Sequence, residues 1–197
     1  SEMPVSSLNK YRIILASGSP RRQELLKGLG LKFVTEVSDW KEDYPSGLKG
    51  AEIAVYLARK KADHFRYRLG KDEIVITADT IVWCDDELLD KPSGEDDAKR
   101  ILRKISDNTH EVITGVCLLS HEKESCFSSS TLVTFTALTD EEIDYYTDNF
   151  KPYDKAGAYG IQEWIGIAAC SRIEGSYFNV MGLPSEQLYH ELLKFAG

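Results

Sequence analysis

Short apolar runs of the kind that form strands alternate along this chain with stretches whose apolar residues recur at helical spacing. The runs that predict strands are Tyr11–Ala16, Ile74–Trp83, Glu111–Leu119 and Thr131–Ala137. The stretches that predict helices are Arg21–Lys27, Ala51–Leu69, Asp96–Ile105, Glu141–Thr147 and Ser185–Phe195. No linker, repeat or low-complexity tract interrupts the alternation. The pattern therefore predicts an α/β fold in which helices cover both faces of a sheet.

Local signals mark the ends of two of these helices. Ser19 is suited to cap the N-terminus of the first helix, with Pro20 at its first position, and Gly28 and Gly30 are suited to end it. Thr139 and Glu142 have the spacing of a capping box, which predicts a helix start at this point.

The length of the chain limits its organisation. With 197 residues, of which 42% are apolar, it is long enough for one substantial core or two closely joined lobes. We expect one domain over residues 11–197, after an N-terminal extension over residues 1–10 in which Ser1 and Glu2 are a cloning remnant before Met3. No apolar run reaches the roughly 18 residues of a membrane span, and Ser1–Lys10 lacks the basic and apolar regions of a signal peptide. The sequence thus predicts a soluble, cytoplasmic protein without a membrane partner.

The charge and the cysteines narrow the classes of partner. A formal net charge of -8 disfavours nucleic acid, because its phosphate backbone attracts a concentrated basic face. A small anionic ligand stays open, since it needs only a local basic pocket or a divalent cation. The four cysteines include no C-x-x-C pair, so we expect free, buried thiols and neither a zinc cluster nor a disulfide framework: Cys84, Cys117, Cys126 and Cys170.

The first segment with candidate chemistry, Leu15-Ala-Ser-Gly-Ser-Pro-Arg-Arg-Gln-Glu24, joins the first predicted strand to the first predicted helix. A helix N-terminus presents unpaired N–H groups and a partial positive charge, which suit a phosphate. Arg21 and Arg22 oppose the helix dipole there, which indicates an anion that their guanidinium groups bind. A capped helix with solvated arginines fits the segment by itself at least as well. The chain has no G-x-x-x-x-G-K-[ST] or G-x-G-x-x-G pattern, so a P-loop or Rossmann site is unsupported.

Asp79 interrupts an otherwise apolar run. Since an unpaired buried carboxylate is costly, we expect it at a strand end or bulge facing a pocket, where it holds a metal ion or a water. The alternative is a turn carboxylate or one paired with a lysine. Lys91 follows a turn-like segment, and a hairpin there would return it towards Asp79, although a surface lysine fits equally. Lys61 has two basic neighbours on its predicted helix, which is typical of a solvated face.

The segment Asp154–Gln162 is rich in glycine. Gly157 and Gly160 permit positive φ or a close approach of backbone to a ligand, and the Gln162 amide suits the edge of a nucleobase. A glycine-rich turn with a surface glutamine is the alternative. The chain has no G-x-S-x-G or H-E-x-x-H motif, so the four histidines are poor candidates for metal ligands.

Taken together and in this order, five motifs resemble the Maf family of nucleotide pyrophosphatases. They are Leu15-Ala-Ser-Gly-Ser-Pro-Arg-Arg-Gln-Glu-Leu-Leu26, Ala78-Asp-Thr80, Lys91-Pro92, Asp154-Lys-Ala-Gly-Ala-Tyr-Gly-Ile-Gln162 and Gly182-Leu-Pro184. The resemblance covers about Ile13–Leu193. It implies a long mixed, twisted sheet flanked by helices, with two lobes and a central cleft for the polyphosphate, similar to the inosine triphosphate pyrophosphatases.

The resemblance also implies roles for single residues. Asp79 matches the family's catalytic carboxylate, and Glu42 matches an acidic position near the metal, which would be Mg²⁺ or Mn²⁺. The matching phosphate-side residues are Ser17, Arg21, Arg22, Lys61 and Lys91. The implied reaction is attack of a metal-activated water on the α-phosphorus, with pyrophosphate as leaving group.

Three positions resemble the branch of the family that acts on dTTP and UTP: Arg21, Thr80 and Gln162. The branch that acts on 7-methylguanosine triphosphate has tryptophan, glutamine and glutamate there. Two segments depart from the family pattern, Glu163-Trp164 and Asp148-Asn-Phe-Lys151, and Glu163 would repel a phosphate or reshape the base pocket. The alternatives to a dTTP/UTP pyrophosphatase are 7-methylguanosine triphosphate hydrolysis and a nucleotide-binding regulator of septation without turnover. A homodimer is left open.

Overall fold

The computed structural model of the chain describes residues 1–37 and 43–197. Contacts divide the chain into two compact units. The first unit comprises Ser1–Asp79, Thr114–Ser129 and Gly182–Gly197, and the second comprises Thr80–Ile113 and Ser130–Met181. Three strands contribute residues to both units: β3 (Glu73–Cys84), β5 (Thr109–Ser120) and β6 (Glu124–Phe135).

The strands form a mixed sheet of seven strands in the order β2-β1-β3-β5-β6-β7, with β4 paired to β3. Strand β1 (Arg12–Leu15) is parallel to β2 (Val34–Thr35) and to β3. Strands β4 (Glu87–Leu89) and β7 (Cys170–Glu174) are antiparallel to β3 and β6. The predicted fold class, a mixed sheet flanked by helices, is confirmed.

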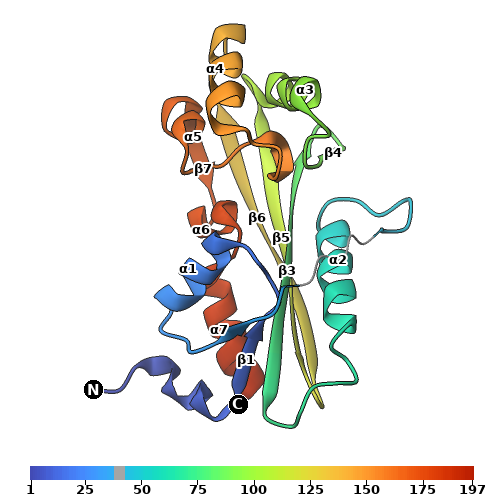
Figure 1. The fold of residues 1–197 in the computed structure, drawn as a ribbon, viewed down its shortest axis with the longest axis vertical. Helices are drawn as coiled ribbons and strands as arrows, with labels where there is room; N and C mark the ends of the chain where they lie inside the picture. The colour runs from blue at the N-terminus through green and yellow to red at the C-terminus, as the bar shows by residue number, and fades with distance from the viewer. Residues whose placement is uncertain (38–42) are drawn as a thin grey trace. The chain divides into compact units, whose positions relative to one another are not determined.

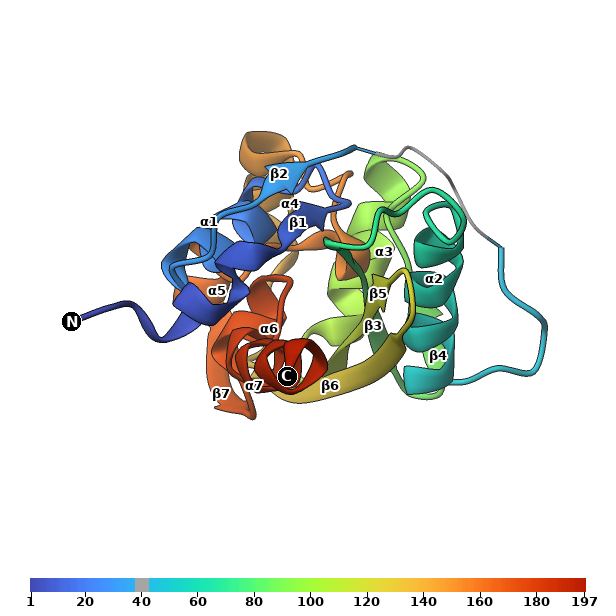
Figure 2. The same cartoon turned by 90° about the horizontal axis from the view of Figure 1, so that it is seen from below.

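The core of the first unit lies on both faces of its part of the sheet. Because successive side chains of a strand point to opposite faces, Ile13 and Leu15 of β1 pack on one side and Ile14 on the other. Helices α1 (Pro20–Gly28) and α7 (Ser185–Ala196) cover the first side, and α2 (Ala51–Asp63) covers the second (Figure 1, Figure 2). Helices therefore cover both faces of the sheet in this unit, as predicted.

Helix α1 begins where its capping signals indicate. The Oγ of Ser19 accepts a hydrogen bond from the backbone N–H of Arg22 at 3.3 Å, and Pro20 is the first helical residue. The helix ends at Gly28, as predicted.

Helix α2 is shorter than the sequence predicts. It ends at Asp63, whereas the helical spacing of apolar residues continues to Leu69. Beyond it the chain forms turns, in which the N–H of Phe65 bonds to the Ala62 carbonyl at 2.9 Å. Phe65 and Leu69 are still buried, so the apolar spacing reflects burial and not a continued helix.

Two contacts fix α2 to the sheet. A Cβ added at Gly115 of β5 would lie 2.3 Å from the carbonyl oxygen of Ala54, so only glycine allows the helix to approach this closely. The hydroxyl of Thr77 on β3 donates to the Ala58 carbonyl at 2.7 Å. The position of α2 is therefore defined along its length.

In the second unit, β3 turns into β4 through Asp85 and Asp86, which both have positive φ, 52° and 61°. This conformation is typical of a tight two-residue hairpin. Helix α3 (Glu95–Ile105) packs against α4 (Asp140–Phe150). Helix α4 begins with the predicted capping box of Thr139 and Glu142. The remaining elements of this unit are η2 (Ala156–Ala158), α5 (Trp164–Ala169) and α6 (Tyr177–Met181).

Several parts of the structure were not predicted from the sequence. The segment expected to be an extension forms a 3-10 helix, η1 (Pro4–Lys10), whose Val5 and Leu8 are buried in the core of the first unit. The first half of β6 is polar and serine-rich, so its strand character has no alternating apolar signal. Within residues 1–37 and 43–197, every helix is too short or too polar to span a lipid bilayer.

The prediction of free thiols is wrong for two of the four cysteines. Cys117 and Cys126 form a disulfide, whereas Cys84 is free and buried, as expected, and Cys170 is free and only partly buried. The hairpin between β5 and β6 brings the two partners together, closed by a hydrogen bond from the Ser120 N–H to the Lys123 carbonyl at 2.9 Å. Their separation of nine residues in the sequence carries no such signal.

Candidate active site

Asp79 lies in the middle of a strand and not at a strand end, which corrects the expectation from the sequence. Strand β3 is buried from Ile74 to Ala78, partly exposed at Asp79 and Thr80, and buried again at Ile81. Its pairing with β1 reaches Ile76, and its pairing with β4 begins at Val82. The carboxylate therefore stands where neither neighbour pairs with this edge of β3, with 20% of the side chain exposed.

Lys61 reaches this carboxylate from helix α2. Its Nζ lies 2.9 Å from Asp79 Oδ1 and donates to the Ala78 carbonyl at 3.0 Å. The Lys61 side chain is 21% exposed, so the pair is shielded from water but not sealed. The basic neighbours of Lys61 predicted a solvated side chain. Its side chain points at Asp79 instead, because helix α2 is held close to the sheet at Ala54 and Ala58.

Arg22 approaches the same carbonyl from α1. Its Nη1 donates to the Ala78 carbonyl at 3.3 Å, and its Nε donates to the Gly182 carbonyl at 2.7 Å. Burial lowers the pKa of Arg22 below its usual value, and the positive charge of Arg21 lowers it further. The negative charge of Asp79 raises the pKa and partly offsets burial. The guanidinium stays charged, since an arginine does not lose its proton in a protein.

Arg22 and Lys61 therefore both donate to the Ala78 carbonyl of the first unit, and Lys61 also pairs with the carboxylate of Asp79. Their charges leave a local excess of one positive charge in a chain with a formal net charge of -8. Such an arrangement attracts an anion locally while the rest of the surface does not. Both long side chains are held by backbone carbonyls, so little ordering remains when a ligand binds.

The start of α1 adds polar groups to this region. The backbone N–H of Ser19 donates to the Ser17 hydroxyl at 3.1 Å, and Ser17 and Arg21 are partly buried. The helix N-terminus is the position where a phosphate meets free N–H groups and a positive dipole. The sequence placed all of these residues together in one motif.

The remaining candidates belong to the second unit. Thr80 follows Asp79 in β3, so strand alternation points its side chain to the opposite face. Lys91 is exposed, and the pairing of β4 ends two residues before it, at Leu89. Gln162 is exposed and follows the buried Ile161 in a turn before α5. Glu42 lies outside the described residues.

The glycine-rich segment is explained in part by packing. Gly157 has φ 71°, and a Cβ there would lie 2.6 Å from Cγ2 of Val82, so this position requires glycine on both grounds. Glu163, a departure from the family pattern, accepts a hydrogen bond from the Tyr146 hydroxyl at 2.6 Å. That hydroxyl in turn accepts from the Gly160 N–H at 3.0 Å, so Glu163 has a partner in its own unit.

The donor set around Asp79 suits one kind of metal ion. Mg²⁺ is usually bound through one or two carboxylates and completes its octahedral shell with waters and substrate phosphates. Asp79 supplies a hard oxygen donor, and among residues 1–37 and 43–197 it belongs to no group of three metal-ligating side chains. Asp79 thus fits an ion whose remaining ligands are waters and substrate phosphates.

Two functional groups were not apparent from the sequence. The carbonyl oxygens of Ala78 and Gly182 hold the two cations, yet a backbone carbonyl carries no residue-type signal. Gly182 has φ 131°, a conformation that favours glycine, so its residue type is the one indication the sequence contains.

Comparison with known proteins gives the following relationships. The Maf-like protein family matches residues 12–195. A dTTP/UTP pyrophosphatase of Phocaeicola vulgatus is 55% identical over 191 residues, which cover 96% of this chain and 99% of that protein. A protein of the same name from Bacteroides fragilis is 50% identical over 189 residues, covering 95% of this chain and 98% of that protein. Among solved structures, a dITP/XTP pyrophosphatase from Mycobacterium abscessus has a TM-score of 0.45 and 12% identity, covering 94% of this chain and 96% of that one.

Proposed function

Because this chain belongs to the Maf-like protein family, we propose that it hydrolyses nucleoside triphosphates, above all dTTP and UTP, to the nucleoside monophosphate and pyrophosphate. The observation that carries the proposal is that Arg22 and Lys61 donate to one backbone carbonyl and that Lys61 also pairs with the Asp79 carboxylate. Relatives named dTTP/UTP pyrophosphatase support the substrate class, since they are 55% and 50% identical over 96% and 95% of this chain.

In the proposed reaction, the oxygen of a water molecule attacks the α-phosphorus and the bond from that phosphorus to the α,β-bridging oxygen breaks. The bridging oxygen leaves as part of pyrophosphate. Asp79 orients the water and accepts its proton, because it is the carboxylate among the groups that converge here. No covalent intermediate with the protein forms.

Arg22 and Lys61 stabilise the charge of the polyphosphate, and Arg21 and Ser17 add donors at the start of α1. Positive groups held in fixed positions contribute most where negative charge grows in the transition state. Lys61 is also a counter-ion for Asp79, at 2.9 Å, which orients the carboxylate.

A divalent cation, Mg²⁺ or Mn²⁺, would be held by Asp79, with Glu42 as the second candidate ligand. When bound, it supplies Lewis-acid activation of the water and neutralisation of phosphate charge.

Specificity for pyrimidines is assigned to the second unit. Gln162 offers an amide donor and an acceptor, which together match the edge of uracil or thymine. Thr80 and Lys91 complete the proposed substrate-binding set. We place the enzyme in the cytoplasm, where nucleoside triphosphates are made and used.

The test is product analysis with purified protein and a panel of triphosphates in the presence of Mg²⁺ or Mn²⁺. The panel contains dTTP, UTP, the other common nucleotides and 7-methylguanosine triphosphate. We expect monophosphate and pyrophosphate in equal amounts, with dTTP and UTP cleaved most efficiently. Binding without product would support a nucleotide-binding regulator instead, and preferential cleavage of 7-methylguanosine triphosphate would overturn the assigned substrate.

A further inference from the structure

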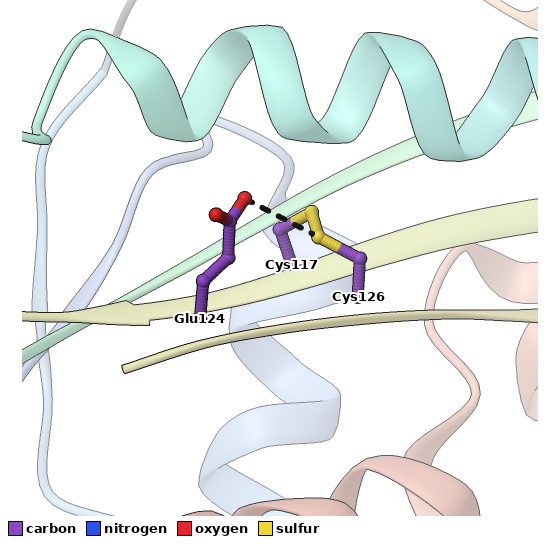
Figure 3. Close-up of side chains that lie close together, drawn as sticks. All are labelled: Cys117, Glu124 and Cys126. Carbon is purple, nitrogen blue, oxygen red and sulfur yellow. Dashed lines mark hydrogen bonds between the residues drawn. A yellow bond between two sulfur atoms is a disulfide. The ribbon is translucent and has the colours of Figure 1, made fainter. Parts of the chain in front are cut away.

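The disulfide between Cys117 and Cys126 lies under helix α2. Cys117 is fully buried in a cluster with Ala58 and Ala62 of α2, and Cys126 is partly buried against the same cluster. Figure 3 shows both side chains, together with Glu124, on the face of the sheet that α2 covers. The bond thus joins β5 to β6 directly beneath the helix that carries Lys61.

We propose that Cys117 and Cys126 are a reversible redox site and that α2 transmits its state to Lys61. In the reducing direction, an external dithiol breaks the S–S bond, becomes a disulfide itself, and leaves a proton on each cysteine. In the oxidising direction, glutathione disulfide takes up the two electrons and two protons and is released as two glutathione molecules. The catalytic consequence rests on the proposed function, whereas the thiol chemistry does not.

The two sulfurs differ in access and in surroundings. Cys126 is partly exposed and Cys117 is not, so attack by an external thiol falls on Cys126. The carboxylate of Glu124 lies 3.8 Å from the Cys126 sulfur. After reduction, the Cys126 thiol can donate to this carboxylate, which gives the reduced state a stabilising contact of its own.

Helix α2 is tied to this pair by packing and by charge. Ala58 and Ala62 contact the buried cluster that contains Cys117. Glu124 forms ion pairs with Arg59 of α2 at 3.3 Å and with Arg66 beyond its end at 3.2 Å. Two unbonded sulfurs need more room than a disulfide, and a close-packed core has none to spare, so reduction displaces the helix or the hairpin.

Lys61 lies on the same helix, between the two alanines that contact the cluster. Its Nζ reaches Asp79 at 2.9 Å, so a small displacement of α2 changes the contact that orients the carboxylate. The oxidised state therefore corresponds to the arrangement described here, and the reduced state to a looser one. Disulfides in a reducing compartment are usually transient or redox-sensing, which agrees with a cycle in the proposed cytoplasmic setting.

A metal site is the competing explanation for the same three side chains. The ligand atoms of Cys117, Glu124 and Cys126 lie within 4.8 Å of one another. However, Arg59 and Arg66 already neutralise Glu124, and two nearby positive charges oppose a cation. The charges thus favour thiol chemistry over metal binding.

The test equilibrates the full chain in glutathione buffers of graded composition, alkylates the free thiols in denaturant, and counts the added groups by mass spectrometry. We expect two alkylated cysteines, Cys84 and Cys170, under oxidising conditions and all four after reduction. In the same samples, reduction should lower Tm by roughly 5–10 °C. It should also lower kcat/KM for UTP roughly 3- to 10-fold, because the Lys61–Asp79 contact is displaced.

Two variants separate the pair from a general effect of reductant. The double variant Cys117→Ala/Cys126→Ser should behave like the reduced protein in every buffer, whereas Cys170→Ser should keep the full response. Four alkylated cysteines in the most oxidising buffer would overturn the proposal, as would two in excess dithiol. Measurable cleavage of UTP with equal kcat/KM in both states would also overturn it. So would one zinc ion bound per reduced chain and lost in Cys126→Ser. If UTP is cleaved in neither state while Tm and thiol count still change together, the redox site stands and the proposed function fails.

Discussion

The two units differ in how far their interacting polar side chains are exposed to solvent. In the first, Arg22 and Lys61 donate to the Ala78 carbonyl, and Lys61 also pairs with Asp79, whose side chain is 20% exposed. In the second, His110 Nε2 lies 2.5 Å from the Tyr159 hydroxyl, and the two side chains are 1% and 6% exposed. Burial lowers the pKa of His110 to about 4 and raises the pKa of Tyr159 well above its usual value.

The partly exposed cluster of the first unit serves the proposed catalysis, whereas the buried pair of the second unit serves stability. The charged groups of the first unit's cluster are partly exposed, so they are available to a ligand. The buried pair is neutral over the physiological range, and the contact between His110 Nε2 and the Tyr159 hydroxyl serves packing, whereas His110 Nδ1 is buried without a hydrogen-bond partner. Changes in the first unit's cluster should therefore alter catalysis with little effect on stability, and changes at His110 should do the reverse.

The largest effect is expected for Asp79→Asn. The amide keeps the shape of the side chain but cannot take up a proton or form an ion pair with Lys61, so turnover of dTTP and UTP should fall roughly 10²- to 10⁴-fold. Steady-state kinetics measure the loss, and circular dichroism with Tm checks that the fold is retained. Asp148→Asn, at an exposed position of α4, is the matched control and should keep full activity. A fully active Asp79→Asn protein would remove Asp79 from the mechanism.

Lys61→Gln should follow, with kcat/KM reduced roughly 10²- to 10³-fold, because a fixed charge on the polyphosphate and the counter-ion of Asp79 are both lost. Lys60→Gln is the matched control on the same helix, and it should stay within about twofold of the wild type. Lys61→Arg should recover part of the loss, since it keeps the charge with a different geometry. Equal effects at positions 60 and 61 would mean that only general charge matters.

His110→Gln tests the contribution of the second unit's buried pair to stability. The lowered pKa of His110 means that the unfolded chain binds a proton more readily, so this residue's contribution is complete above about pH 6.5 and is lost as the pH falls towards 4. The full contribution amounts to about 3.4 kcal/mol, of which about 2–3 kcal/mol is lost between pH 7 and pH 4.5, and glutamine abolishes this pH dependence. Denaturant unfolding of the wild type and of His110→Gln between pH 7 and pH 4.5 measures this contribution to stability. The variant should have the same kcat/KM as the wild type at pH 7. Parallel pH profiles of stability for the two proteins would show that His110 does not carry this linkage.

The smallest effect is expected for Thr139→Ala. Loss of the capping box of α4 should lower the free energy of unfolding by about 1 kcal/mol and Tm by roughly 2–4 °C. Activity should not change, because the residue belongs to the second unit's scaffold. Thr139→Ser keeps the cap and is the control, and thermal unfolding monitored by circular dichroism distinguishes the two. Equal stability of the two variants would mean that the capping box does not contribute measurably to the free energy of unfolding.

The fold class and several element boundaries could be predicted from the sequence because local signals specify them. Helix starts are fixed at Ser19 with Pro20, and at Thr139 with Glu142, by hydrogen bonds from backbone N–H groups to side-chain oxygens within four residues. The end of α2 could not be predicted in this way, since Phe65 remains buried on a turn and keeps the apolar spacing of a helix. The polar half of β6 is a strand because it pairs with β5, a cause that lies elsewhere in the chain.

The site shows the same division. The motif around Arg21 and Arg22 and the isolated Asp79 were visible as residue types, and the family resemblance selected Lys61 from a basic run. The Ala78 carbonyl that joins Arg22 and Lys61 could not be seen, because any residue supplies a carbonyl. The disulfide was missed for a related reason, since strand register and not sequence spacing brings its two cysteines together.

The most direct measurement is hydrolysis of UTP in ¹⁸O-labelled water, with mass analysis of both products. Attack on the α-phosphorus predicts that the label appears in uridine monophosphate and that pyrophosphate is unlabelled. Label in pyrophosphate would contradict the account, as would formation of uridine diphosphate with inorganic phosphate. So would unreacted UTP after prolonged incubation of folded protein with Mg²⁺ and Mn²⁺.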